Sequence, residues 1–177
     1  KRQPLTLNET DLMRTINIAF NIALLFGFST LFILEIHNLI NKLNETNDRL
    51  NYIATHHALT GLYNRHSLTG ALSALKTSER PFCIVMGDLD DFKKVNDTYG
   101  HECGDVVLKS VSEVILRNMG GGNTACRWGG EEILMIMYGT AMDCFNTISR
   151  IKAQINNLKI THDGTPVKVS MTCLLYT

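Results

Sequence analysis

The sequence lacks an excess of charge of either sign. Its 177 residues carry 17 Lys and Arg against 17 Asp and Glu, so the formal net charge is zero. Proteins that bind nucleic acid usually concentrate positive charge to neutralise phosphates. We therefore predict no nucleic-acid partner.

Paired cysteines are also lacking, because the five cysteines are odd in number, widely spaced and without a Cys-x-x-Cys pair. This spacing argues against a zinc site and against a disulfide framework. We expect reduced, mostly buried thiols. With 45% apolar residues, the length allows one globular core and an appended segment, but not two full domains.

Near the N-terminus stands a run without charge, residues 16–34. Its length is close to that needed to cross a bilayer. We predict a transmembrane helix over residues 16–36, with residues 1–15 as the end of an unknown upstream region. The alternative is a buried core helix, because polar residues such as Asn17 and Asn21 dilute the run.

An apolar heptad follows this run. Ile36, Leu43 and Leu50 recur every seven residues among Asn, Glu, Asp and Lys. The repeat predicts a coiled-coil linker helix over residues 37–56 that pairs with a second copy of the chain. The alternative is a solvated connecting helix in a monomer.

The remaining chain alternates between strand and helix patterns. After a helix over residues 65–75, we predict the following order: strand 82–86, helix 91–99, helix 104–118, strands 124–127 and 133–137, helix 141–158 and strand 167–174. This β-α-α-β-β-α-β order predicts an α+β fold with a ferredoxin-like or polymerase-palm sheet, antiparallel at its centre.

Carboxylates end two of these strands. Asp88 follows the first, and Glu131 and Glu132 follow a pair of glycines that we expect at positive φ in a hairpin turn. Taken singly, such acids are typical of solvated hairpin tips and helix caps. If the two strands are neighbours, Asp88 and Glu131 converge as hard oxygen ligands suited to Mg²⁺ and a nucleotide triphosphate.

Three segments in order resemble one family: ALTGLYNR at 58–65, DLDDFKKVNDTYGHECGD at 88–105 and RWGGEE at 127–132. Together they resemble the GGDEF domain of the diguanylate cyclases, over residues 57–177. The resemblance implies an enzyme that joins two GTP molecules into cyclic di-GMP across a homodimer. The alternative is a catalytically inactive relative, a GTP-binding or dimerisation module of a membrane receptor.

The resemblance implies a metal site at the acidic strand ends. Asp88 and Glu131 are the implied catalytic pair, and they would hold Mg²⁺, or Mn²⁺ as the alternative ion. The backbone carbonyl of Leu89 and the carboxylate of Glu132 are the other implied ligands.

A second group of residues is implied to bind the substrate. Asn96 and Asp105 match the family positions that read the guanine edge. Lys93 and the backbone amides around Phe92 would meet the phosphates.

The sequence departs from the family pattern at several positions. The Arg-x-x-Asp of the family's product-inhibition site falls on Gly120 and Asn123, so we predict no inhibitory site. His57 stands where an Asp is usual. Thr172 replaces a common Gly in the last strand, and we expect it to crowd the sheet. The residues up to Thr177 do not include the C-terminal helix whose Lys and Arg are implied to grip the triphosphate.

The charges that flank residues 16–34 do not orient the predicted span, since basic residues lie on both sides. A domain that uses GTP must face the cytoplasm. We therefore predict that the chain lies in the bacterial inner (cytoplasmic) membrane, with its GGDEF domain on the cytoplasmic side.

Overall fold

The computed structural model describes residues 9–75 and 80–177. The chain divides between Leu50 and Asn51 into two compact units. The first unit consists of a single helix, α1 (Glu9–Thr55), whose last five residues belong to the second unit. The predicted span and the predicted linker are therefore parts of one continuous helix.

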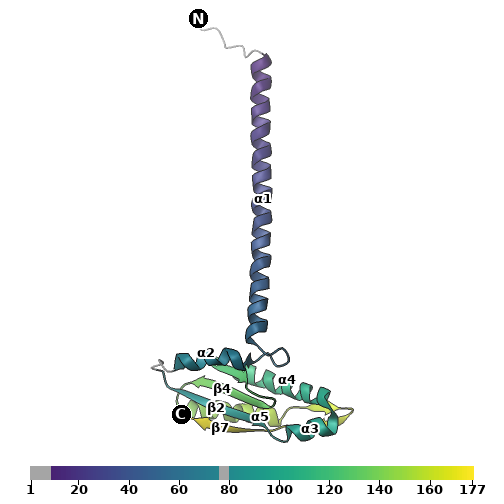
Figure 1. Ribbon diagram of the computed structural model, residues 1–177, viewed down its shortest axis with the longest axis vertical. Coiled ribbons are helices and arrows are strands. Elements are labelled where there is room, and N and C mark those ends of the chain that lie inside the picture. The colour runs from purple at the N-terminus through teal and green to yellow at the C-terminus, as the bar shows by residue number, and fades with distance from the viewer. Residues whose placement is uncertain (1–8, 76–79) are drawn as a thin grey trace. The chain divides into compact units, whose positions relative to one another are not determined.

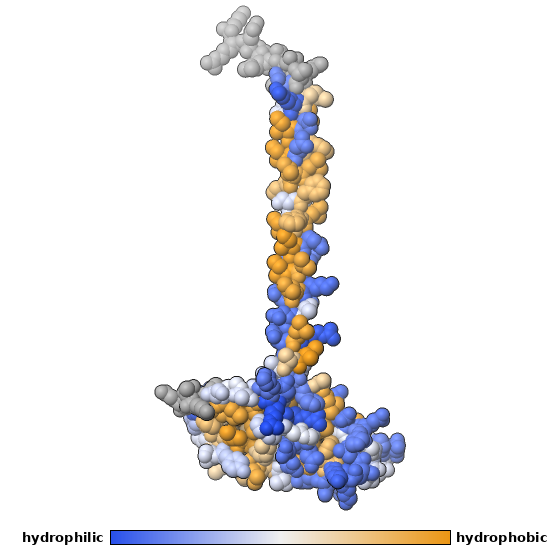
Figure 2. All heavy atoms as spheres, in the orientation of Figure 1, coloured by the Kyte–Doolittle hydropathy of each residue, from blue (hydrophilic) through white to orange (hydrophobic). Residues whose placement is uncertain are grey.

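Apolar side chains of α1 lie open on its surface (Figure 2). Between residues 11 and 50, every described residue except Gly27 is exposed. Within the described chain, α1 is the one helix long and apolar enough to cross a membrane, and none of its most apolar window is buried. A signal sequence near the N-terminus passes the same test of length and apolar composition. The helix is therefore a candidate span.

A five-stranded sheet forms the centre of the second unit (Figure 1), in the order β1-β3-β4-β2-β7. Its strands are β1 (Tyr63–Asn64), β3 (Thr124–Arg127), β4 (Glu132–Tyr138), β2 (Phe82–Leu89) and β7 (Met171–Tyr176). β1 pairs in parallel with β3, and all other pairs are antiparallel. The predicted α+β fold with an antiparallel centre is confirmed.

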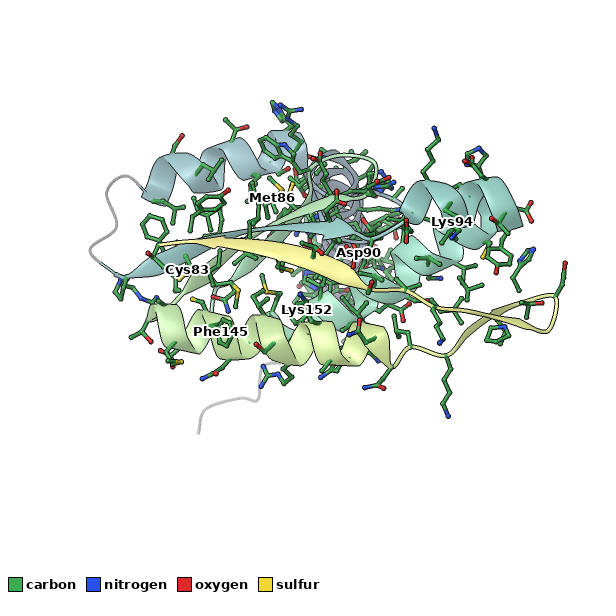
Figure 3. The ribbon with its side chains drawn as sticks, turned by 90° about the horizontal axis from the view of Figure 1, so that it is seen from below. Cys83, Met86, Asp90, Lys94, Phe145 and Lys152 are labelled. Atoms are coloured by element: carbon green, nitrogen blue, oxygen red, sulfur yellow. The ribbon has the colours of Figure 1, made fainter. Side chains whose placement is uncertain are left out.

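Four helices cover the two faces of this sheet. They are α2 (Arg65–Leu75), α3 (Phe92–Tyr99), α4 (His101–Asn118) and α5 (Ala141–Asn156). Figure 3 shows α5, which carries Phe145 and Lys152, on one side of the sheet and α2 on the other.

Strand β2 illustrates how the two faces are built. Its odd-numbered residues Cys83, Val85 and Leu89 are buried in the larger core, together with residues of α3, α4 and α5. Its even-numbered residues Ile84 and Met86 pack, partly buried, against the smaller core under α2. The period-2 alternation of a strand therefore sends successive side chains into different cores.

The predicted strand 167–174 is wrong, because two separate strands occupy this stretch. Asp163 and Gly164 both adopt positive φ angles, 48° and 78°, which is the geometry of a tight two-residue hairpin turn. This turn joins β5 (Ile160–His162) to β6 (Thr165–Val167) in a separate two-stranded sheet. β7 begins afterwards, and the continuous alternation of apolar residues concealed the break.

The cysteines lie as expected. Four are buried and Cys173 is partly buried, and all five are free thiols. Burial raises the pKa of Cys126 to about 11 and, as the largest cause, that of Cys144 to about 12. Cys126 and Cys144 therefore stay protonated at neutral pH, and their contribution is to packing.

Truncation of the core side of α5 should destabilise the domain. Ile151 is fully buried in the larger core, so Ile151→Ala should lower the free energy of unfolding by about 2–5 kcal/mol through lost burial and a cavity. Met142 of the same helix is 66% exposed, and Met142→Ala is the matched control, with a change below about 0.5 kcal/mol. Urea denaturation followed by circular dichroism measures both, and equal effects would contradict this core assignment.

Candidate functional site

The two acidic strand ends are neighbours across the central strand pair. β2 and β4 pair in an antiparallel register that sets Asp88 directly opposite Glu132. Directly opposed residues project from the same face of a sheet. β7 continues this row, because Thr172 is the partner of Asp88 on its other side. Glu132, Asp88 and Thr172 thus lie side by side across three strands.

Glu131 lies one residue before this row, in the turn between β3 and β4. Its backbone carbonyl accepts a hydrogen bond from the backbone amide of Leu89 at 3.4 Å. The ladder thereby extends past Asp88 and places Glu131 opposite Leu89. The backbones of the four residues predicted to hold a metal are thus neighbours at the end of one strand pair, and the metal site itself stays a prediction.

The expectation of positive φ at Gly129 and Gly130 is wrong, since neither is among the positive-φ residues of the described chain. The carboxylate of Glu132 instead folds back over the turn and lies against Gly129, so a Cβ there would displace this carboxylate. The backbone amides of Trp128 and Gly129 donate to the carbonyl of Glu132 at 2.9 and 3.3 Å. These two hydrogen bonds close the turn.

Arg127 braces this turn from the end of β3. Its Nε and Nη2 donate to the carbonyl oxygen of Gly130 at 3.2 and 2.8 Å, and Nε also lies 3.3 Å from that of Gly129. Its Nη1 lies 3.0 Å from Nε2 and 3.4 Å from Nδ1 of His57. Arg127 therefore connects His57 to the acidic turn.

These donors fit a divalent cation that is shared with a nucleotide. Among the residues that the structure describes, no three His, Cys, Asp or Glu side chains gather into a group able to hold a metal. Asp88 and Glu132 are exposed and Glu131 is partly exposed. Mg²⁺ commonly takes one or two carboxylates and completes its octahedron with water and phosphate oxygens. The carboxylates at these strand ends would supply the one or two protein ligands.

The two residues predicted to read guanine lie on neighbouring helices. The side-chain oxygen of Asn96, on α3, packs so closely against Gly104 of α4 that a Cβ at Gly104 would overlap it. Asp105 is the next residue on α4 and is exposed. An amide and a carboxylate thus lie near one helix crossing. Together they offer the hydrogen-bond donor and acceptors that could pair with the edge of a base.

The start of α3 follows the acidic loop. Asp91, its N-cap, has φ 56° and makes no side-chain capping hydrogen bond, so no side chain occupies the amides of the first turn, which is the usual anion site of a helix. Phe92 is only 7% exposed and belongs to the core, so only its backbone is available to a ligand. Lys93 is exposed.

Asp90 is an anchor that the sequence interpretation missed. Its carboxylate accepts hydrogen bonds from the hydroxyls of Ser170 and, at 2.7 Å, Thr172, and its backbone amide donates to the carbonyl of Ser170 at 3.0 Å. These bonds hold the pKa of Asp90 below its usual value, with the Ser170 contact as the largest cause. The expected crowding by Thr172 is not found, because its exposed side chain turns to Asp90. The available signal was the i, i+2 spacing of Asp88 and Asp90 at the end of β2.

The loop at the position of the family's product site has a structural task here. The backbone amide of Asn123 donates to the carbonyl of Gly120 at 3.2 Å, and its side-chain oxygen accepts from the backbone amide of Tyr138 at 2.9 Å. Asn123 therefore ties this loop to the end of β4.

A groove of about 750 Å³ lies beside Asp90, between α3 and the segment that leads into β7. Lys94, Tyr99 and Lys168 are among its lining residues, and Figure 3 shows Lys94 on α3. None of the residues predicted to bind metal or nucleotide lines it. The predicted site is instead the open surface above Asp88.

Known proteins share this combination of fold and motif. Residues 54–175 match the family described as diguanylate cyclase, GGDEF domain. Response regulator PleD of Caulobacter vibrioides is 37% identical over 108 residues, which are 58% of this chain and 24% of that protein. Diguanylate cyclase A of Treponema denticola is 30% identical over 128 residues, 72% of this chain and 34% of that protein. The chain thus spans about a quarter to a third of the length of these relatives.

A solved structure agrees with the same fold. The GGDEF domain of DgcB from Caulobacter crescentus, in complex with c-di-GMP, superposes with a TM-score of 0.64 at 29% sequence identity. The match covers 69% of this chain and 76% of that chain.

Removal of the Thr172 hydroxyl should raise the pKa of Asp90. Because the folded-state pKa lies below its ordinary value of 3.8, the carboxylate stabilises the fold above the unfolded-state pKa, and this contribution is lost as the pH falls through the folded-state pKa. In Thr172→Val we expect the Asp90 carboxyl, followed by NMR, to titrate at higher pH than in the unsubstituted chain. Thr172→Ser keeps the hydroxyl and should retain the low value, and an unchanged pKa in Thr172→Val would refute the contact.

Proposed function

Because the chain belongs to the GGDEF-domain family of diguanylate cyclases, with 54–175 matched, we propose that it condenses two GTP molecules into cyclic di-GMP. The observation that supports this most is the register of β2 and β4, which aligns Asp88 with Glu132 and Leu89 with Glu131. These are the positions at which the resemblance implies metal ligands. The products would be cyclic di-GMP and two pyrophosphates.

Asp88 and Glu131 would hold Mg²⁺, or Mn²⁺, with the carbonyl of Leu89 and with Glu132. When bound, the metal neutralises phosphate charge and makes the attacking 3′-hydroxyl more acidic. The task of the residues is alignment more than covalent chemistry, because phosphoryl transfer depends mainly on positioning and charge stabilisation. Lys93 and the first amides of α3 would meet the phosphates, while Asn96 and Asp105 hold the base.

One domain with one guanine site binds one GTP, whereas the product joins two. In each of two steps a 3′-hydroxyl attacks the α-phosphate of the other nucleotide, a new phosphodiester forms and pyrophosphate leaves. We therefore propose that two copies of the chain face each other. The exposed heptad of α1, with Ile36 at 41%, Leu43 at 66% and Leu50 at 61% exposure, supports a parallel helix pair as the dimer contact.

We propose a membrane location for the N-terminal part of α1, because its exposed apolar surface is of the kind that lipid covers. GTP is a cytoplasmic metabolite, so the catalytic domain would lie on the cytoplasmic side of the bacterial inner membrane.

A second candidate function is a nucleotide-binding or dimerisation module without turnover. One observation favours it: Thr172 lies directly opposite Asp88, at a position where the family commonly has Gly. The family's Gly offers no side chain here, whereas the hydroxyl of Thr172 engages Asp90, two residues after the catalytic carboxylate. Chromatographic analysis of the product decides between the two functions, because the second predicts GTP binding without cyclic di-GMP.

Loss of one metal-binding carboxylate should abolish turnover. We expect Glu131→Gln to lower the rate of cyclic di-GMP formation from GTP and Mg²⁺ by roughly 100-fold or more, since a metal ligand contributes several kcal/mol to charge stabilisation. Glu113→Gln removes an exposed acid of α4 that lies outside the site and should change the rate less than about two-fold. Equal rates in all three proteins would refute the assignment.

The product should not inhibit through the loop at residues 120–123. This loop carries Gly120 and Asn123 in place of Arg and Asp, so it offers neither the bidentate cation nor the carboxylate that a guanine and phosphate ligand would need. We expect initial rates measured with added cyclic di-GMP to be the same in the unsubstituted chain and in Gly121→Ser. Inhibition that this loop variant relieves would contradict the prediction.

A further inference from the structure

The His57 side chain lies between the end of α1 and the acidic turn. The residues before it are tied to the domain: Asn64 Nδ2 donates to the carbonyl of Ala54 at 2.8 Å, and Ser67 Oγ donates to that of Thr55 at 2.9 Å. His57 itself begins a tight turn, because its backbone amide donates to the carbonyl of Leu62 at 2.8 Å. Its backbone is therefore fixed, and only its ring is free to change partner.

The contact of His57 with Arg127 requires a neutral ring. A guanidinium has only donors. Arg127 Nη1 lies 3.0 Å from Nε2 and 3.4 Å from Nδ1 of His57, so a neutral ring offers one acceptor nitrogen to the donors around it and an imidazolium offers none. Nδ1 also lies 3.3 Å from the backbone amide of Leu59, a further donor. Protonation would give both ring nitrogens a hydrogen and set a positive charge against the guanidinium, so an imidazolium cannot keep this contact.

Arg127 transmits the state of His57 to the acidic turn. The same guanidinium donates to the carbonyl oxygens of Gly129 and Gly130. The carbonyl of Gly130 belongs to the peptide bond that leads into Glu131. A shift of the guanidinium away from a charged ring would therefore release the peptide that orients this carboxylate.

We propose that His57 is a positioning residue for Glu131. In its neutral form His57 holds Arg127 against the carbonyl oxygens of Gly129 and Gly130, and it releases Arg127 when the ring is protonated. Its effect on catalysis rests on the proposed function, whereas its effect on the turn does not. An Asp, usual at this position in the family, would keep a negative charge at neutral pH. The His makes the brace dependent on pH between about 5 and 7.

The charged surroundings of His57 agree with a neutral ring. The titratable groups that face it are Arg127 from β3 and Asp105 from α4. Burial is the largest cause that lowers the pKa of His57 below its ordinary 6.5, the charge of Arg127 lowers it further, and Asp105 opposes both. His56, the next histidine, instead stacks its ring between Tyr52 and Tyr63, with centroids 4.1 and 4.3 Å away.

The only tryptophan of the chain reports on the turn. Trp128 follows Arg127, and the guanidinium of Arg65 lies 4.3 Å from its ring centroid. Its fluorescence in the chain of 177 residues, held in detergent micelles, can be followed from about pH 8 to pH 5 through the range of histidine titration. We expect one transition with a midpoint below the ordinary histidine pKa. It should persist in His56→Gln and vanish in His57→Gln, whose amide oxygen accepts from Arg127 without titrating.

Product formation supplies the second measurement. From about pH 7.5 to 5.5, we expect the turnover number to fall roughly ten-fold more in the unsubstituted chain than in His57→Gln, with KM for GTP little changed. His57→Asp should likewise resist acid, and circular dichroism checks that each variant is folded. A fluorescence transition that survives in His57→Gln, or that is absent from the unsubstituted chain, would overturn the proposal. Failure of every variant to form product would refute the proposed function instead, and the fluorescence would still decide the role of His57.

Discussion

The pairing register of β2 with β4 is the constraint on which the candidate site depends. A slip of one residue would move Asp88 to the other face of the sheet and bury it among the side chains of α4 and α5. The alternation of β2 prevents this slip, because Val85 and Leu89 fill the larger core while the even-numbered residues meet the α2 side. Hydrophobic burial therefore fixes the position of a charged group that contributes nothing to the core. The same pairing holds Leu89 to Glu131, so core and site are specified by one set of contacts.

Much of this arrangement could be predicted from the sequence, because strong periodicity and acidic strand ends are local signals. The helices and strands between residues 82 and 156 were placed within a few residues, and the convergence of the acidic strand ends followed from their order. The break between β6 and β7 could not be predicted, since the alternation of apolar residues continues through residues 168–170, which separate the two strands. The close approach of the Glu132 carboxylate to Gly129 could not be predicted either, because it is a contact that no local pattern encodes.

The departures from the family pattern share a feature: each residue has acquired a hydrogen-bonding partner. Thr172 donates to Asp90 instead of crowding the sheet, Asn123 accepts from Tyr138, and His57 contacts Arg127. A substitution that leaves a buried polar group unpaired costs free energy, whereas one that finds a partner costs little. The fold can therefore accommodate these residues without loss of stability. These residues instead bear on the candidate site. Thr172 lies beside the Asp88 end of the site, and His57 lies beside the turn that carries Glu131.

The two sides differ in what they respond to. On the β7 side, the hydroxyls of Ser170 and Thr172 hold Asp90, and neither hydroxyl titrates near neutral pH. The loop after Asp88 is thus fixed under all ordinary conditions. On the β3 side, Arg127 holds the turn of Glu131, but Arg127 is itself held by a histidine at the end of α1. One half of the site is therefore rigid, and the other is connected to the helix through a group with a variable charge. Protonation of His57 would therefore act on the turn of Glu131, while the hydroxyl contacts on the Asp88 side would stay in place.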